Sequence, residues 1–165
     1  MRHLGWDSPS GAYLAMSAND ALRVLVVDDH QDTIDSLAIL LRCWGHEVHV
    51  AREGEAALKQ ALSVKPQLML VDLAMPGMDG LQLARRLRIQ PDFSKTPLIA
   101  VTGLSDQFHR RQAAEAGFDD FIVKPYSAAE LLEVLARVQL SVAMATEAAV
   151  GLPAPAKSAL LSETN

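Results

Sequence analysis

The sequence LRVLVVDD, at residues 22–29, is the stretch that decides the fold. It is a short apolar run rich in β-branched valine, and Asp28 and Asp29 follow it at once. Because the run lacks a strict alternation of polar and apolar residues, it predicts a strand that is buried on both faces. Strands of this kind belong to parallel sheets that carry helices on both sides.

The chain from there to about residue 140 alternates short apolar runs with segments of helical periodicity. The apolar runs predict further strands at residues 47–51, 68–71, 97–101 and 118–123. Apolar residues at helical spacing predict helices around residues 34–44, 57–62, 81–87, 105–116 and 127–140. Ser127 is the expected N-cap of the last helix, with Glu130 in capping-box position. This order predicts an α/β fold with a doubly wound, five-stranded parallel sheet in three α/β/α layers.

Both ends of the chain differ in composition from this central part. Residues 1–20 mix Gly, Ser, Pro and Asn without a period, which indicates a flexible leader. Residues 141–165 are rich in Ala and Pro and are expected to form a tail or linker. No apolar run reaches the roughly 18 residues that span a bilayer, and no secretory signal is recognisable. The lone Cys43 is expected to be a buried thiol in a reducing compartment, and the protein to be cytoplasmic.

Chemically active side chains follow four of the predicted strands. They are the residues Asp28, Asp29, Asp72, Thr102 and Lys124. Parallel strands present their carboxyl ends at one rim of the sheet, which is where such folds bind ligands, so the five should converge. Three carboxylates at about 4 Å repel one another by about 4 kcal/mol per pair at an effective dielectric of 20, and a cation would relieve this. Oxygen ligands on a charged rim suit Mg²⁺. The alternative is that the acids merely cap loops.

Four separated motifs resemble the receiver domains of two-component response regulators. They are VDD at residues 27–29, DLAMPGMDG at 72–80, VTG at 101–103 and VKP at 123–125. The resemblance covers about residues 22–140 and makes 21–140 the expected receiver domain, with a flavodoxin-like (βα)5 fold. The net charge of −5 offers no basic face for nucleic acid, so direct nucleic-acid binding is not expected, and neither is membrane binding.

The resemblance implies a role for each rim residue. Asp72 would take a phosphoryl group from a phosphohistidine on a histidine kinase or a histidine phosphotransfer protein. Asp28, Asp29 and Asp72 would hold Mg²⁺ together with the backbone carbonyl of Ala74. Lys124 and Thr102 would bind the phosphoryl group. The bond before Pro125, after Lys124, would be cis.

The resemblance also implies a switch. Thr102 would move toward the phosphoryl group and Phe121 would fill the space it leaves, changing the face formed by the fourth helix, fifth strand and fifth helix for a protein target. Phe121 could instead be a static core aromatic. Ala74 and Leu104 lie two residues after Asp72 and Thr102, and neither side chain can orient an attacking water. Slow loss of the phosphoryl group is therefore expected.

Several alternatives remain open at the level of sequence. The chain could be a separate signalling protein, monomeric or dimerising on phosphorylation, or a receiver fragment of a hybrid histidine kinase. A Mg²⁺-dependent phosphatase with an aspartyl-phosphate intermediate is a rival, but it needs an acid where Ala74 stands. A regulatory phospho-acceptor, not a turnover enzyme, is the favoured interpretation.

Other polar residues carry simpler expectations. His30, beside the acidic pair, is interpreted as a solvated residue at a helix start. His46 and His49 should lie on opposite faces of a strand, which disfavours a metal site there. His109, Arg110 and Arg111 form a basic patch, either a solvated face or part of the output surface. Gly77 and Gly80 do not form a phosphate loop, because no Gly-Lys-Ser/Thr follows.

Overall fold

The computed structural model of the chain describes residues 21–104 and 106–150. The expected leader at residues 1–20, and residues 151–165 of the expected tail, lie outside the described part. Five strands form one parallel sheet in the order β2-β1-β3-β4-β5. They are β1 (Arg23–Val27), β2 (Glu47–Ala51), β3 (Leu68–Val71), β4 (Leu98–Thr102) and β5 (Asp120–Val123). The predicted parallel sheet is confirmed.

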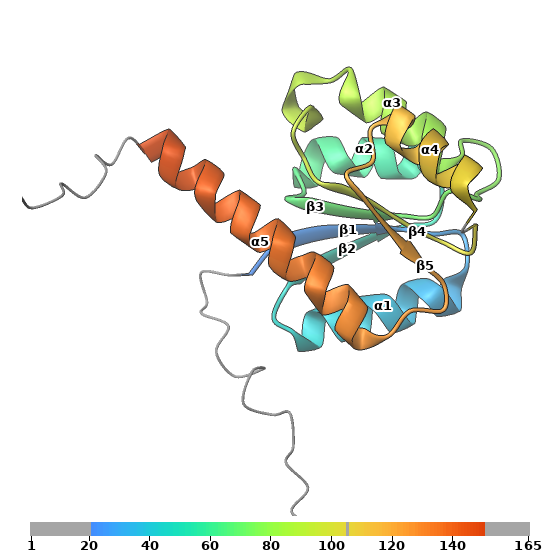
Figure 1. Cartoon of the computed structure of the whole chain (residues 1–165), viewed down its shortest axis with the longest axis horizontal. Coiled ribbons are helices and arrows are strands. Elements are labelled where there is room, and N and C mark those ends of the chain that lie inside the picture. The colour runs from blue at the N-terminus through green and yellow to red at the C-terminus, as the bar shows by residue number, and fades with distance from the viewer. Residues whose placement is uncertain (1–20, 105, 151–165) are drawn as a thin grey trace, which may run out of the picture.

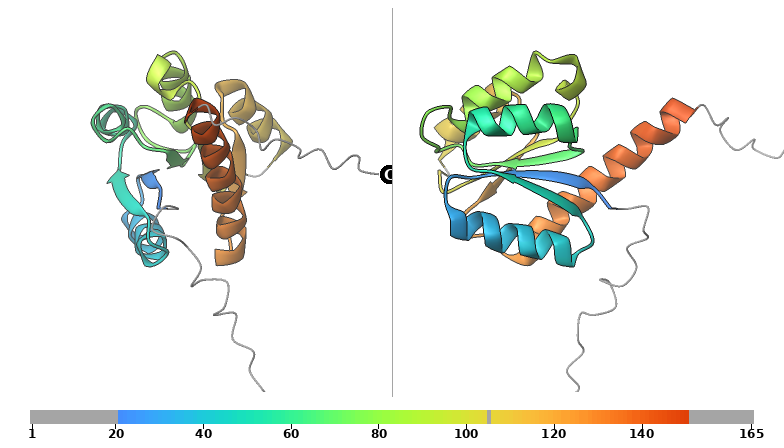
Figure 2. Two further views of the ribbon diagram at one scale, coloured as in Figure 1. Left: turned by 90° about the vertical axis from the view of Figure 1, so that its left-hand side faces the viewer. Right: turned by 180° about the vertical axis from the view of Figure 1, so that it is seen from behind.

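Helices cover both faces of this sheet (Figure 1). They are α1 (Gln31–Cys43), α2 (Gly54–Val64), α3 (Gly80–Arg88), α4 (Gln107–Ala116) and α5 (Ala128–Val150), with a short 3-10 helix, η2 (Pro91–Phe93), after α3. Helices α1 and α5 pack on one face, and α2, α3 and α4 pack on the other. The two further views in Figure 2 show the sheet between these layers. The predicted three-layer α/β/α fold is confirmed.

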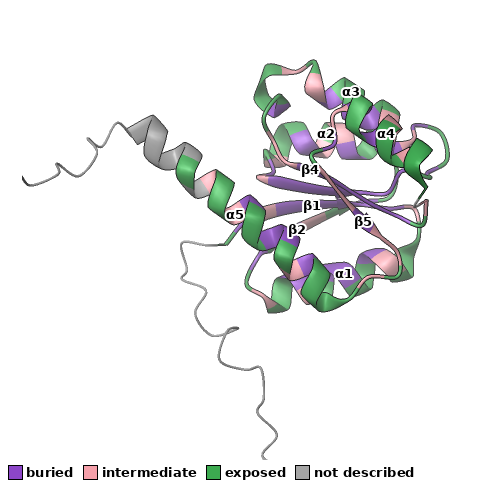
Figure 3. Cartoon of the chain, in the orientation of Figure 1, coloured by how far each residue is buried: buried purple, intermediate pink, exposed green. Residues whose placement is uncertain are grey.

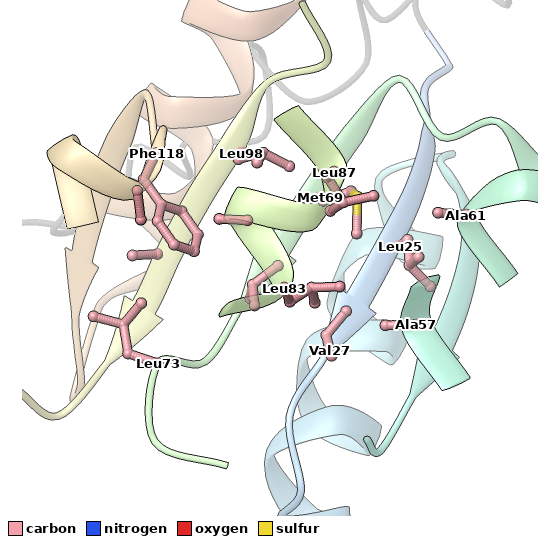
Figure 4. Packing of buried hydrophobic residues seen from close by; sticks show 14 of the residues in the cluster. Leu25, Val27, Ala57, Ala61, Met69, Leu73, Leu83, Leu87, Leu98 and Phe118 are labelled. Carbon is pink, nitrogen blue, oxygen red and sulfur yellow. The ribbon is translucent and has the colours of Figure 1, made fainter. Parts of the chain in front are cut away.

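The apolar side chains of β1 contribute to both hydrophobic cores. Leu25 and Val27 belong to the core under α2, α3 and α4, whereas Val24 and Val26 belong to the core under α1 and α5. Successive side chains of a strand point to opposite faces, so a strand covered twice must be apolar at every position. Figure 4 shows the first core, where Leu25 and Val27 lie near Ala57, and Figure 3 shows the buried strands between exposed outer helix surfaces.

Helix α5 is longer than the sequence pattern predicted. It begins behind Ser127, and the capping box is confirmed: Ser127 N donates to Glu130 Oε2 over 2.7 Å, and Glu130 N donates to Ser127 Oγ over 3.2 Å. It then continues to Val150, so the expected boundary at residue 141 falls inside a helix that projects past the sheet (Figure 1). Alanine favours helix most strongly, and no Gly or Pro interrupts the chain before Gly151. Among the described residues, no helix is both apolar enough and long enough to cross a bilayer.

Two smaller expectations need correction. Cys43 is exposed, not buried, because the inward face of α1 is formed by Ile34, Leu37, Ala38 and Leu41, and the helical period turns position 43 away from it. Helix α4 begins at Gln107 instead of near residue 105. Its N-cap is Asp106, whose carboxylate accepts a hydrogen bond from His109 N over 3.0 Å.

Candidate functional site

The predicted rim residues do lie together at the carboxyl ends of the strands. Val27 of β1 is in register with Val71 of β3, so Asp28 and Asp72, the next residues, leave the sheet side by side. Thr102 ends β4 and lies beside Val123, which precedes Lys124. Asp28, Asp72 and Thr102 keep only 3%, 5% and 0% of their surface exposed. Four strands thus deliver polar groups into one largely buried pocket.

The ammonium group of Lys124 bridges two carboxylates of this pocket. Its Nζ lies 2.5 Å from Asp28 Oδ2 and 3.4 Å from Asp72 Oδ2, so Lys124 pairs with both carboxylates and Asp28 is the nearer partner. Burial by itself lowers the pKa of Lys124, but the hydrogen bond to Asp28 and the charges of Asp72 and Asp28 outweigh it, and the net pKa is raised. Lys124 therefore carries its charge at neutral pH.

Several acidic side chains gather beside the ammonium group of Lys124. Ligand atoms of Asp28, Asp29, His30 and Asp72 all lie within 4.8 Å of one another. Asp29 Oδ1 is buried and makes no hydrogen bond, which is costly for a carboxylate oxygen. His30 Nδ1 lies 3.0 Å from that oxygen without hydrogen-bonding alignment. The clustered oxygens, one of them without a donor, fit a small divalent cation.

A close approach at Gly80 and a hydrogen bond from Ala74 hold the segment after β3 against Asp72. A Cβ atom on Gly80 would lie 2.3 Å from the backbone oxygen of Asp72, so only glycine permits this approach of α3. Ala74 N donates to Asp72 Oδ1 over 3.4 Å, and the Ala74 side chain is exposed. The sequence pattern had excluded a phosphate loop at Gly80 but had not anticipated this packing role. The close approach holds the loop after β3 over the pocket.

The expected switch residues occupy neighbouring strands. Thr102 Oγ1 accepts the N–H of Leu104 over 3.3 Å, which leaves its hydroxyl proton free to be donated. Phe121 is half-buried on β5, and its ring lies 4.7 Å from the guanidinium carbon of Arg110. The Lys124–Pro125 bond is cis, as the resemblance implied. The part played by Arg110 was not recognisable from the sequence, where it belonged to a generic basic patch.

Comparison with known proteins gives one consistent family. Residues 24–136 match the model of the response regulator receiver domain. The sensory transduction protein RegX3 of Mycobacterium tuberculosis is 38% identical over 109 residues, which are 66% of this chain and 47% of RegX3. The chain thus spans about half the length of this curated relative.

Solved structures agree with the sequence comparison. The receiver domain of a histidine kinase from Syntrophus aciditrophicus is 34% identical with a TM-score of 0.69, covering 74% of this chain and 92% of that one. The receiver domain of the Pseudomonas aeruginosa sensor histidine kinase PA1611 has a TM-score of 0.68 at 28% identity, covering 72% and 98%. That structure carries a magnesium ion in its active-site cleft.

Proposed function

Because this chain belongs to the response regulator receiver family, we propose that it is a phospho-accepting signalling module in which Asp72 takes the phosphoryl group. The observation that carries the proposal is that Lys124 lies between two carboxylates from other strand ends. Its Nζ is 2.5 Å from Asp28 Oδ2 and 3.4 Å from Asp72 Oδ2. An aspartate that is buried beside a lysine at a strand end is poised as a nucleophile.

The chemistry needs few groups. A carboxylate oxygen of Asp72 attacks the phosphorus of a phosphohistidine, the phosphorus–nitrogen bond breaks, and the imidazole leaves with the bonding pair. Lys124 then offsets the charge of the phosphoryl oxygens, since it lies 3.4 Å from Asp72 Oδ2. Thr102 donates its hydroxyl proton to a phosphoryl oxygen. Positioning and charge stabilisation supply most of the catalysis in such transfers.

The acidic groups of the pocket are suited to Mg²⁺. Asp28, Asp29 and Asp72 would hold it, together with the backbone carbonyl of Ala74, and Asp29 Oδ1 would gain the partner that it lacks. When bound, the ion would neutralise charge on the phosphoryl group during transfer. The magnesium in the PA1611 receiver supports this assignment by analogy.

The module would act by switching a protein-binding face. In this proposal Thr102 turns toward the phosphoryl group, Phe121 turns inward, and the surface of α4, β5 and α5 changes for a target protein. The phosphoryl donor would be a histidine kinase or a histidine phosphotransfer protein. Receivers of histidine kinases and of a sensory transduction protein are both similar to this chain, so a kinase-fused receiver is the second candidate arrangement.

A phosphatase reaction is disfavoured by one residue. Enzymes that turn over an aspartyl phosphate need an acid two residues after the nucleophile to protonate the leaving group. That position is Ala74, whose exposed methyl group carries no proton to give. The pocket therefore supports acceptance of a phosphoryl group over repeated hydrolysis of substrates.

Intact-mass measurement tests the proposal directly. The chain is incubated with Mg²⁺ and acetyl phosphate, and we expect a gain of one phosphoryl group that is absent in Asp72→Asn and in EDTA. Asp92→Asn is the matched control, because Asp92 is an exposed acid paired with Lys65 far from the pocket, and it should be phosphorylated normally. A gain that persists in Asp72→Asn would contradict the assignment.

A further inference from the structure

Among the described residues, His30 is the one side chain grouped with the acids of this rim that offers a nitrogen ligand. It is the N-cap residue of α1, directly after Asp29, and its side chain is 70% exposed. Its Nδ1 lies 3.0 Å from Asp29 Oδ1 and 3.4 Å from Asp28 Oδ1. The expectation from sequence, a solvated residue at the helix start, accounts for its exposure but not for this orientation.

Helix capping does not explain the ring orientation either. The side chain of His30 makes no capping hydrogen bond to α1. Its backbone N–H donates to Asp28 Oδ1 over 2.9 Å, a bond that any residue with an N–H would make. The facing oxygen, Asp29 Oδ1, is buried and has no hydrogen-bond partner. The imidazole nitrogen thus lies within ion-pair distance of the carboxylate oxygen, with no hydrogen bond between them.

These separations match those between ligands that share an ion. Carboxylate oxygens and imidazole nitrogens bind divalent ions at about 2.1 Å. Two such ligands at right angles lie about 3.0 Å apart, and two at the tetrahedral angle about 3.4 Å apart. The distances from His30 Nδ1 to Asp29 Oδ1 and Asp28 Oδ1 are 3.0 and 3.4 Å. A single ion could therefore contact all three residues without a large movement.

We propose that His30 Nδ1 is a further protein ligand of the divalent ion at this rim, and that it selects for ions that favour imidazole. The inference rests on the proposed function, because it presupposes the ion pocket beside Asp72. Mg²⁺ prefers oxygen and keeps several waters, so it binds without His30. Co²⁺ and Zn²⁺ accept imidazole readily and would engage it. The pocket would then take up these ions more tightly than its carboxylates alone allow.

The test compares two ions in matched variants of the full chain. Calorimetry measures Mg²⁺ and Co²⁺ binding to the unmodified chain, to His30→Asn and to His49→Asn. The pH is kept at least one unit above the ordinary histidine pKa of about 6.5. Asparagine places an amide oxygen where Nδ1 stood, so an ion that prefers oxygen loses little. His49, which pairs with Glu47 on β2, is the matched histidine control. Mg²⁺ competition and the proton NMR signal of a Co²⁺-bound imidazole N–H complete the experiment.

We expect His30→Asn to weaken Co²⁺ binding at least about tenfold and Mg²⁺ binding less than about threefold. We expect His49→Asn to change neither affinity. Excess Mg²⁺ should displace Co²⁺. The NMR signal of the Co²⁺-bound imidazole N–H should vanish in His30→Asn alone. Equal changes for both ions, or Co²⁺ that Mg²⁺ cannot displace, would overturn the role of His30 while Mg²⁺ binding still supports the proposed function. Absence of Mg²⁺ binding in the unmodified chain would instead overturn both.

Discussion

The guanidinium carbon of Arg110 lies 4.7 Å from the centre of the Phe121 ring. Arg110 belongs to α4 and Phe121 to β5, so this cation–π contact joins two elements of the proposed output face. Phe121 is half-buried, with the guanidinium over its ring. The contact therefore favours the conformation that the proposed switch would leave on phosphorylation.

Replacing Arg110 by methionine should release this ring. A cation–π contact at a partly exposed site contributes about 0.5–1 kcal/mol, which corresponds to about a two- to fivefold change in a population ratio. We expect Arg110→Met to raise the fraction of the inward Phe121 conformer by that factor before phosphorylation. The chain has 4 phenylalanines, so ¹⁹F NMR with fluorophenylalanine can follow the Phe121 signal, assigned through Phe121→Leu. Arg111→Met is the control, because Arg111 forms an exposed ion pair with Glu115, and it should leave the signal unchanged. An identical shift in both variants would argue against the contact.

A second arginine holds the sheet edge to α3. The Arg88 side chain is 18% exposed and donates to the carbonyls of Gly117, Phe93 and Thr96 and to Asp119 Oδ2, over 2.7–2.9 Å. Arg88→Met removes all four of these hydrogen bonds. Phe93 O keeps Thr96 N as a donor and Asp119 Oδ2 keeps Leu98 N, but the carbonyls of Gly117 and Thr96 lose Arg88, so we expect a loss of about 2–4 kcal/mol in the free energy of unfolding.

Urea denaturation measures this effect against a nearby control. Arg86→Met removes an exposed pair with Glu55, which should cost at most about 1 kcal/mol. Equal losses in the two variants would show that the part-buried hydrogen bonds of Arg88 stabilise the fold no more than an exposed ion pair does.

The sequence predicted the parts of the structure that depend on periodicity. The apolar run of β1 predicted a doubly covered strand, and acids at strand ends predicted that Asp28 and Asp72 meet, because parallel strands end at one rim. The same reasoning predicted that Lys124 lies at this rim. It did not indicate that Asp28 would be the nearer of its two carboxylate partners. These predictions succeed because sheet geometry alone fixes which residues are neighbours.

Predictions that depend on the direction of one side chain were harder. Arg85, Arg86 and Arg88 crowd one stretch of α3, and nothing in that stretch indicates that Arg88 alone reaches the carbonyls around Gly117. Cys43 was expected to be buried because its sequence neighbours are apolar, but the helical period decided its exposure. Such contacts arise from tertiary packing that no local pattern encodes.

The stability of the chain should depend on the protonation of His46. Leu22 N donates to His46 Nδ1 over 3.2 Å, which requires that nitrogen to be unprotonated. Burial lowers the pKa of His46 from the ordinary 6.5. The unfolded chain therefore binds more protons than the folded chain once the pH falls toward 6.5 and below. This contribution to stability is complete above pH 6.5 and is lost as the pH falls through the lowered folded pKa.

Urea unfolding at a series of pH values measures this dependence. Asparagine can accept the Leu22 N–H without titrating, so His46→Asn should lose less stability than the unmodified chain on acidification. The half-buried His49, which pairs with Glu47, is the control, and His49→Asn should follow the unmodified chain. A His46→Asn curve parallel to that of the unmodified chain would refute the coupling.

The lifetime of phosphorylated Asp72 depends on what can orient a water beside it. Ala74 is exposed at the pocket and Leu104 is half-buried, and neither side chain has a polar atom to hold an attacking water. We expect phospho-Asp72 to persist for minutes or longer in Mg²⁺ buffer, followed by intact mass after removal of acetyl phosphate. Ala74→Asn adds an amide that can position water, and we expect roughly tenfold faster loss, less than a full general base provides.

Ala114→Asn is the control for the added amide, because Ala114 is exposed on α4 and lies outside the pocket. Its phospho-Asp72 should decay at the rate of the unmodified chain. A lifetime of only seconds in the unmodified chain would mean that another group already orients the water. The exposed imidazole of His30, beside Asp29, would then be the first group to replace, because a ring nitrogen there can accept a proton from water.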